Sequence, residues 1–458
     1  MSRPVLPSTS MRVTLVATYE LGRQPFGLAS PAAWLREAGI EVTTVDLSRE
    51  SFRPEAFVTD LVAFHLPMHT ATRLALPVIR RVRALSSTTR LCCYGLYAPM
   101  NASVLRDLGV ERVLGGEFEQ TLLEVATRGA VPIDGVGADD AMPRLRFRVP
   151  DRSGLPALDR YALLQTPSGD RKVVGYTEAS RGCKHLCRHC PVVPIYGGRF
   201  RVVPRDVVLA DVRAQVEAGA RHITFGDPDF FNGVGHAVAI VETFAREHPG
   251  VSYDVTIKIE HLRQHDDRLE VLRDTGCLFV VSAAESIDDA VLARLDKGHT
   301  RADFEQVVAR CRQVGLTLAP TFIPFTPWTT LAGYHELLRT IDTLDLVAQV
   351  APIQLALRLL IPHESRLLEL DRARLGVELG PFDTSRLVYP WRHPDPRVDR
   401  LQAMVAGIVG RRFTASRAAV FDELLALAAD QAGAVAARRP AGVGDRATVA
   451  YLNEPWYC

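Results

Sequence analysis

A chain of 458 residues, 47% of them hydrophobic, is long enough for two or three domains with full cores. The charges nearly balance at a net charge of +1, which argues against a nucleic-acid partner or an acidic target surface. No run of about 18 apolar residues occurs, and the N-terminal stretch holds no apolar signal core, so we expect no membrane partner. The eight cysteines are too unevenly spaced for a secreted disulfide framework, which favours a cytoplasmic location.

Residues 1–135 alternate between strand and helix patterns. Apolar runs predict strands at 11–19, 40–48, 60–68 and 90–98, and a fifth strand with a helix within 110–129; helices are predicted at 31–39 and 71–85. This alternation predicts a Rossmann-like, doubly wound parallel sheet with ligands at the carboxyl ends of its strands. His65 and His69 flank one such end and are either structural groups or ligand contacts, whereas Cys92 and Cys93 lie in an apolar strand as predicted core residues.

A linker is predicted over 136–170, followed by a second α/β domain over 171–365. Its predicted strands cover 172–180, 222–231, 252–262, 277–286, 316–325 and 354–362, with helices at 205–220, 266–276 and 301–315 between them. This order predicts a partial (β/α)6 barrel whose chemistry lies at the carboxyl ends of the strands. We expect a helical cap over 366–440 and a tail over 441–458 that ends in a cysteine.

The loop after the first barrel strand carries three cysteines, Cys183, Cys187 and Cys190, at the spacing CxxxCxxC. A structural zinc site needs four donors, and the next cysteine, Cys277, is nearly ninety residues away. Three thiolates suit three irons of a 4Fe–4S cluster and leave the fourth iron open to a reacting ligand. The loop histidines are alternative metal ligands. The sequence therefore predicts an iron–sulfur site on this loop.

With Ser180-Arg181-Gly182 before it, the cysteine spacing resembles that of the radical S-adenosylmethionine (radical SAM) superfamily. The Gly-Gly-Glu at 115–117, the Phe-Phe at 230–231 and the segment 292–300 are similar to the branch that carries an N-terminal cobalamin-binding domain. The resemblance implies a 4Fe–4S cluster, SAM, a small-molecule substrate and an electron donor such as flavodoxin or ferredoxin. Cobalamin stays open, because the turn at 19–22 lacks the ligating histidine of the DxHxxG motif.

The same resemblance implies roles for residues at the strand ends. Gly226 and Asp227 are expected to hold the SAM amine, and Glu285 is expected to accept hydrogen bonds from the ribose hydroxyls. Lys258 and Arg358 are expected to pair with the SAM carboxylate or a substrate anion. A salt bridge inside the barrel is the alternative for either cation. His189 departs from the family, which usually has an aromatic residue before its third cysteine.

The last residues, Glu454-Pro455-Trp456-Tyr457-Cys458, resemble the end of the CUAEP/CCAEP-tail radical SAM proteins, in which a second cysteine or selenocysteine follows. That group is similar to the arsinothricin-forming enzyme, which transfers a 3-amino-3-carboxypropyl group to trivalent arsenic. The resemblance implies a catalytic thiol at Cys458 and the possibility of a selenoprotein, with a UGA codon after that residue. A fraying tail without a role is the alternative.

The sequence thus predicts a radical SAM enzyme that transfers a carbon fragment of SAM to a small acceptor, with trivalent arsenic as the favoured acceptor. A cobalamin-dependent radical methyltransferase is the alternative among enzymes. A non-catalytic iron–sulfur redox protein is the alternative from another class.

Overall fold

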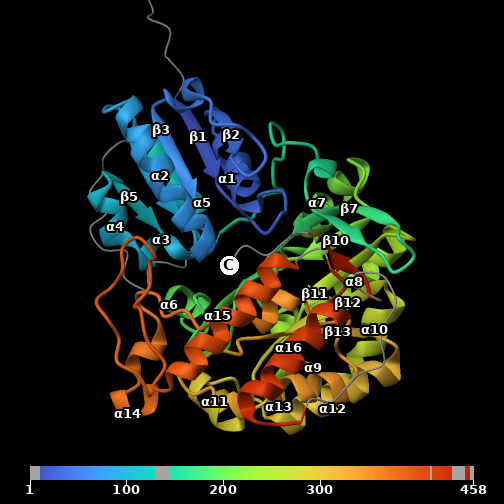
Figure 1. Ribbon diagram of the computed structural model, residues 1–458. Helices are drawn as coiled ribbons and strands as arrows, with labels where there is room; N and C mark the ends of the chain where they lie inside the picture. The colour runs from blue at the N-terminus through green and yellow to red at the C-terminus, as the bar shows by residue number, and fades with distance from the viewer. Residues whose placement is uncertain (1–10, 129–144, 413–414, 436–448, 454–458) are drawn as a thin grey trace, which may run out of the picture. The chain divides into compact units, whose positions relative to one another are not determined.

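The computed structural model describes residues 11–128, 145–412, 415–435 and 449–453, and the chain divides into two compact units (Figure 1). The first unit is Met1–Arg160 and the second is Tyr161–Cys458. The division between them falls inside the segment 136–170 that was predicted as a linker.

The first unit holds a five-stranded sheet in the order β2-β1-β3-β4-β5, in which every pair is parallel. Its strands are β1 (Arg12–Ala17), β2 (Glu41–Asp46), β3 (Leu61–His65), β4 (Arg90–Tyr94) and β5 (Arg112–Leu114). Its helices are α1 (Phe26–Glu37), α2 (His69–Leu85), α3 (Tyr97–Met100), α4 (Ala102–Asp107) and α5 (Glu119–Arg128). The predicted doubly wound sheet is confirmed.

Both faces of this sheet are buried, as expected where helices connect parallel strands. Alternate strand residues such as Leu15 and Ala63 pack in one core cluster with residues of α1 and α5, while Val16 and Phe64 are buried on the opposite face. Cys92 belongs to that core cluster, and Cys93 beside it is also buried. Burial raises the pKa of the Cys92 thiol to about 12, so these two residues are inert core side chains.

The second unit holds a seven-stranded sheet in the order β13-β12-β11-β10-β7-β6-β14. Its parallel strands are β7 (Arg171–Thr177), β10 (His222–Phe225), β11 (Ser252–Thr256), β12 (Cys277–Glu285) and β13 (Thr317–Phe322). The connecting helices are α7 (Arg205–Glu217), α8 (Val234–Glu247), α9 (Ile259–Gln264), α10 (Leu269–Asp274), α11 (Asp289–Leu295), α12 (Arg301–Val314) and α13 (Leu331–Thr343). Figure 1 shows α8, α10, α12 and α13 on the outer side of this curved sheet, which is a half barrel.

Two short strands extend the half barrel beyond β7. β6 (Leu163–Gln165) pairs antiparallel with β7, and β14 (Tyr451–Leu452) pairs antiparallel with β6. β14 therefore runs in the same direction as the parallel strands of the barrel.

The sixth predicted barrel strand, 354–362, does not form. The 3₁₀ turn η5 (Pro352–Leu355) occupies its start, and one parallel bridge between Phe325 and Arg358 is its remaining pairing. Pro324 separates this bridge from β13, and a proline has no N–H to continue the ladder.

The predicted cap over 366–440 is helical in its second half only. α15 (Pro396–Arg411) and α16 (Arg417–Ala432) are regular helices, whereas 366–395 holds the turn η6 (Arg366–Glu369), the one-turn helix α14 (Arg372–Leu375) and two isolated bridges. Gly376, Gly380, Pro381, Pro390 and Pro394 interrupt any helical pattern in that stretch.

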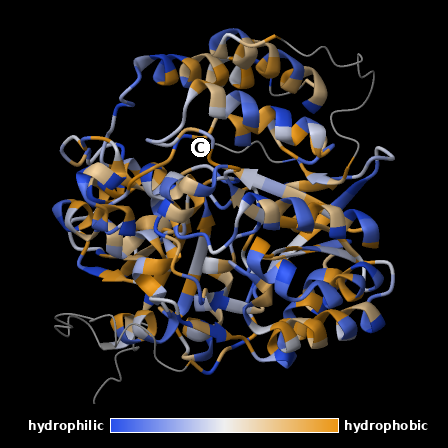
Figure 2. Ribbon diagram, turned by 90° about the horizontal axis from the view of Figure 1, so that it is seen from below, coloured by the Kyte–Doolittle hydropathy of each residue, from blue (hydrophilic) through white to orange (hydrophobic). Residues whose placement is uncertain are grey.

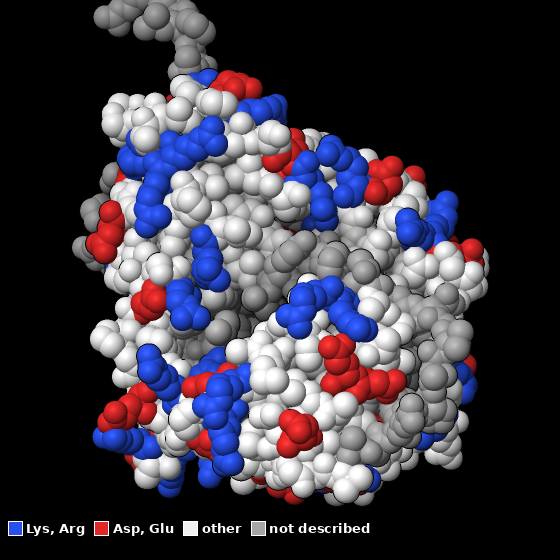
Figure 3. Space-filling model, in the orientation of Figure 1, with Lys and Arg blue, Asp and Glu red and all other residues white. Residues whose placement is uncertain are grey.

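Figure 2 shows hydrophobic and hydrophilic residues alternating along the helices, as amphipathic helices require. In α12, for example, the buried residues are Phe304, Val307, Val308, Cys311 and Val314, which lie on one face of the helix. On the face shown in Figure 3, positive and negative side chains lie interspersed, in keeping with the net charge of +1. Within the described part of the chain, every helix is too short or too polar to cross a bilayer.

Candidate metal and cofactor site

The cysteine loop begins just beyond β7, at the carboxyl edge of the half barrel. A short antiparallel pair of strands, β8 (Ser180–Gly182) and β9 (Phe200–Val202), brackets the loop and the helix α6 (Val192–Tyr196). Gly182 has a φ of +76°, and a Cβ at this position would overlap the Tyr196 ring and lie 2.5 Å from the carbonyl oxygen of Arg199. The residue before Cys183 must therefore be glycine.

The three thiols share one partly enclosed site. Cys187 is buried, and Cys183 and Cys190 are partly buried. Burial, with smaller contributions from the Asp229 charge and the Cys187 thiol, raises the pKa of Cys183 to about 11. Burial, with smaller contributions from the other two thiols, raises the pKa of Cys190 to about 12, while backbone N–H groups of His185 and Val192 donate to the sulfurs of Cys183 and Cys190. A bound cation or metal cluster would stabilise the thiolate forms here, so the donor set fits the three protein ligands of a 4Fe–4S cluster.

Asp227 and Gly226 support the start of this loop. Asp227 is buried, and its carboxylate accepts from the backbone N–H of Ala179 at 3.0 Å and from the Ser180 hydroxyl at 2.5 Å. Burial outweighs these hydrogen bonds and raises the pKa of Asp227 to about 6. The Tyr176 ring packs directly on Gly226, where a Cβ would overlap its hydroxyl. Both predicted SAM contacts thus lie next to the loop, and Asp227 directs one carboxylate oxygen at the Ala179 backbone and the other at the Ser180 side chain.

A first ionic network joins the loop to the start of α9 and the region after β10. His185 lies 3.4 Å from Asp229 through Nε2 and 3.4 Å from Glu260 through Nδ1. Asp229 is also 2.7 Å from His261 Nδ1, and Lys258 Nζ is 3.2 Å from Glu260. Burial tends to raise the pKa of Asp229, but His185 and His261 lower it overall, so the buried carboxylate is ionised.

This network also bears on the alternative metal-ligand role of the loop histidines. Donor atoms of Cys183, His185 and Asp229 lie within 4.8 Å of one another. The imidazole of His185 is already placed between two carboxylates, Asp229 and Glu260. Paired in this way, His185 is suited to holding the loop in place.

A second ionic network lies at the end of β12. His189 Nε2 is 3.0 Å from Glu285 Oε1, and Lys297 Nζ is 3.5 Å from the same oxygen. Burial alone would raise the pKa of Glu285, but the Lys297 ammonium and the His189 hydrogen bond lower it to about 2. Glu285 is therefore a fully ionised carboxylate at the carboxyl edge of the barrel.

The segment after α11 lies between the two networks. A Cβ at Gly298 would be 2.6 Å from Glu260 Oε2 and 3.6 Å from Lys258 Nζ. Burial, followed by the charges of Lys297 and Lys258, lowers the pKa of His299 to about 4, so this imidazole is neutral. Two buried lysines thus lie near the cysteine loop, each paired with a glutamate.

Arg358 forms a salt bridge within the protein, which is the alternative to a SAM contact that the sequence left open. Its guanidinium lies 2.7 Å from Asp399, donates to the Trp391 carbonyl at 2.9 Å and stacks 3.6 Å above the Trp391 ring. Cys458 lies outside the described residues, so the structure gives no contact for the predicted tail thiol.

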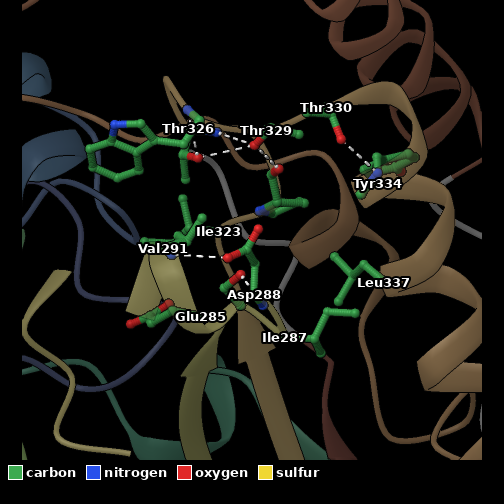
Figure 4. Close-up of a pocket in the computed structure, with 14 residues that line it drawn as sticks. Glu285, Ile287, Asp288, Val291, Ile323, Thr326, Thr329, Thr330, Tyr334 and Leu337 are labelled. Atoms are coloured by element: carbon green, nitrogen blue, oxygen red, sulfur yellow. Dashed lines mark hydrogen bonds between the residues drawn. The ribbon is translucent and has the colours of Figure 1, made fainter. Parts of the chain in front are cut away.

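A small cavity of about 50 Å³ lies beside Glu285, between the ends of β12 and β13 (Figure 4). Its polar groups serve the protein itself: Asp288 caps α11, Thr330 caps α13, and Thr329 donates to the Pro324 carbonyl. The cavity is therefore a packing feature next to the site.

The sequence did not single out Lys297, Asp229, Glu260 or His261 as site residues. Asp229 comes shortly after β10, Glu260 and His261 come shortly after β11, and Lys297 comes shortly after α11. Their positions just beyond the carboxyl ends of barrel strands, or beyond the helix α11 that follows β12, could have marked them as candidate site residues. Lys297 directly follows Asp296, a left-handed residue with φ +57° that ends α11.

Residues 177–340 match the family model of the Radical SAM superfamily. Hopanoid C-3 methylase of Methylococcus capsulatus is 25% identical over 325 residues, which cover 67% of this chain and 62% of the methylase. A tRNA-2-methylthio-N(6)-dimethylallyladenosine synthase of the same organism is 26% identical over 200 residues, 41% of this chain and 43% of the synthase. The chain therefore spans less than two thirds of either relative.

Two solved structures share the fold. TsrM from Kitasatospora setae, a radical S-adenosylmethionine methyltransferase solved with cobalamin and a 4Fe–4S cluster, matches with a TM-score of 0.58 at 17% identity, over 74% of each chain. OxsB, a cobalamin-dependent S-adenosylmethionine radical enzyme solved with aqua-cobalamin and S-adenosylmethionine, matches with a TM-score of 0.66 at 13% identity, over 89% of this chain and 67% of OxsB.

Proposed function

The chain carries a radical SAM domain, and we propose that it reductively cleaves SAM and transfers a SAM-derived carbon fragment to a small acceptor. The observation that carries the proposal is the set of three thiols, Cys183, Cys187 and Cys190, on one loop at the carboxyl edge of the half barrel. When bound there, a 4Fe–4S cluster supplies the electron that breaks one C–S bond of SAM.

The surrounding side chains suit the binding of SAM. We assign the SAM carboxylate to Lys258, a buried cation near Cys183 that also pairs with Glu260, and the ribose hydroxyls to Glu285, an ionised acceptor. Gly226 brings backbone close to the loop for the SAM amine, and Asp227 supports it by holding the loop backbone. We no longer favour Arg358 for the carboxylate, because Asp399 and the Trp391 carbonyl engage its guanidinium.

For the transferred fragment, the tail resemblance supports 3-amino-3-carboxypropyl transfer to trivalent arsenic, with Cys458 as a thiol that binds the soft acceptor. The direction of β14 agrees with this role. Asn453 N bonds Leu163 O, and Leu163 is level with Val173, four residues before the end of β7. β14 therefore points along β7 toward the carboxyl edge, and Cys458 itself lies outside the described residues.

Methyl transfer with cobalamin is the second candidate, because TsrM is named as a methyltransferase and was solved with cobalamin. In the first unit, His65 lies at the end of β3, but its imidazole is buried against Gly27 and 3.5 Å from Glu20. His65 is therefore poorly placed to hold a corrinoid, if one were bound. The described part of the first unit would suit a corrinoid held without that imidazole, at the carboxyl ends of its strands.

Iron analysis tests the cluster assignment. Anaerobically reconstituted wild type should contain about four irons and four sulfides per chain, as a 4Fe–4S cluster requires. A variant with Cys183, Cys187 and Cys190 all changed to Ala should contain almost none and cleave no SAM, whereas the buried Cys277→Ala serves as the matched control with full iron. Full cluster content in the triple variant would contradict the assignment.

Product analysis after reduction with dithionite separates the reactions. Methylthioadenosine would support 3-amino-3-carboxypropyl transfer. S-adenosylhomocysteine together with 5′-deoxyadenosine, formed only with added cobalamin, would favour the methyltransferase. A fully loaded cluster that never cleaves SAM would point instead to an iron–sulfur redox protein.

A further inference from the structure

We propose that His189 and Lys297 are positioning residues that hold Glu285 in the orientation in which it recognises the sugar hydroxyls of SAM. The inference rests on the proposed SAM cleavage and adds the means by which this chain builds the sugar contact. His189 belongs to the cysteine loop and Lys297 follows α11, so two separate segments converge on one carboxylate oxygen of Glu285.

The backbone of Glu285 is strained. Its φ is +63°, in the left-handed region that non-glycine residues rarely adopt, and the pairing of β12 with β13 shifts register between Ala283 and Glu285. The Glu285 carbonyl still accepts from Ile323 N at 2.9 Å, so the strand end is held in place on its β13 side. Such strain persists only where the surroundings over-determine it, and it is concentrated at functional sites.

The segments that carry His189 and Lys297, the two partners of Glu285, are joined to each other by hydrogen bonds. The backbone N–H of Arg188, next to His189, donates to the Leu295 carbonyl at the end of α11, and the Arg188 side chain donates to the Ala293 and Arg294 carbonyls. Lys297 follows two residues after Leu295 and is itself buried. A movement of the cysteine loop would therefore move the whole framework around Glu285.

Glu285 keeps the capacity to bind a ligand. Both contacts are made by Oε1, and an ionised carboxylate offers about four acceptor positions. Figure 4 shows Glu285 on the opposite side of the small cavity from Tyr334 and Leu337. Two donors on Oε1 anchor that oxygen and leave Oε2 for a ligand, and an acceptor held in this way distinguishes a sugar that carries hydroxyls from one that lacks them.

The test uses the anaerobically reconstituted full chain and two probes, SAM and an analogue whose sugar lacks both hydroxyls. Dissociation constants are measured for wild type, His189→Phe, His189→Gln, Lys297→Met and Glu285→Gln, each with its iron content. Phe is the kind of residue common before the third cysteine and removes only the donor, whereas Gln keeps an N–H donor at this position. Iron content reports on the cluster separately from sugar recognition.

Wild type should prefer SAM over the analogue by about tenfold or more, since the analogue lacks the hydroxyls that would donate to the second carboxylate oxygen of Glu285. His189→Phe, Lys297→Met and Glu285→Gln should lose most of this preference at full iron content, and His189→Gln should retain it. An unchanged preference in His189→Phe and Lys297→Met would overturn the inference and leave the proposed function standing. Loss of iron in both would also overturn it, because the residues would then hold the cluster. Failure of wild type to bind SAM would instead contradict the proposed function.

Discussion

Replacing Gly298 by Ala tests the close packing between the two ionic networks. Gly298 has a φ of +74°, and a Cβ there would lie 2.6 Å from Glu260 Oε2. Gly315 is the matched control, because its φ is also +74° and the nearest atom to its Cβ would be 4.0 Å away. Gly315→Ala should therefore cost only the backbone strain of about 1–2 kcal/mol.

Gly298→Ala adds a steric term to the same strain. Ordinary contact needs about 3.4 Å or more, so the Glu260 oxygen, which is the end of a flexible side chain 3.2 Å from Lys258, would have to move by about 0.8 Å. The displacement itself is therefore cheap, and the added cost is the weakened pairing with Lys258, up to about 1 kcal/mol beyond the strain. Urea denaturation should show Gly298→Ala less stable than Gly315→Ala by roughly that amount, and the Kd for SAM should rise in Gly298→Ala alone.

A double-mutant cycle identifies the cause. Glu260→Ala removes the obstructing carboxylate, so it should reduce the cost of Gly298→Ala and leave the cost of Gly315→Ala unchanged. Equal stability of the two single glycine variants, or strict additivity of Gly298→Ala with Glu260→Ala, would refute the packing argument.

Three further predictions concern single side chains. Burial raises the pKa of Asp227 from 3.8 to about 6, so its contribution to stability is full below about pH 3.8 and is lost as the pH rises through 6. In urea titrations across that window, the free energy of unfolding of wild type should fall by about 3 kcal/mol relative to that of Asp227→Asn. Parallel plots of unfolding free energy against pH for the two proteins would contradict this. Arg358→Met should lower stability by about 1 kcal/mol and leave the Kd for SAM unchanged, whereas a large rise in Kd would restore Arg358 as a SAM contact. Cys277→Ala, at a buried core position, should cost about 1 kcal/mol and leave the iron content intact, and lost iron would make it a ligand.

The alternation of strands and helices could be predicted because each element has its own local pattern of apolar residues in the sequence. Parallel strands buried on both faces are short apolar runs, and the helices between them repeat apolar residues at helical spacing. The same local pattern failed at 354–362, where an apolar run between Pro352 and Pro362 became a turn and a single bridge. A strand exists only when a neighbour pairs with it, and β13 already ends before Pro324.

For the candidate site, too, one part could be predicted from the sequence and another part could not. The sequence alone determined the cysteine loop, because the spacing of Cys183, Cys187 and Cys190 brings three thiols onto one short turn without help from distant residues. Only the tertiary structure decided what surrounds them: Glu285 meets His189 across 96 positions of sequence, and Arg358 pairs with Asp399 across 41. A carboxylate or a cation such as Glu285 or Arg358 can take its partner from a distant segment of the chain. Its role depends on which segments the barrel brings within hydrogen-bonding distance, and that is a property of the whole fold.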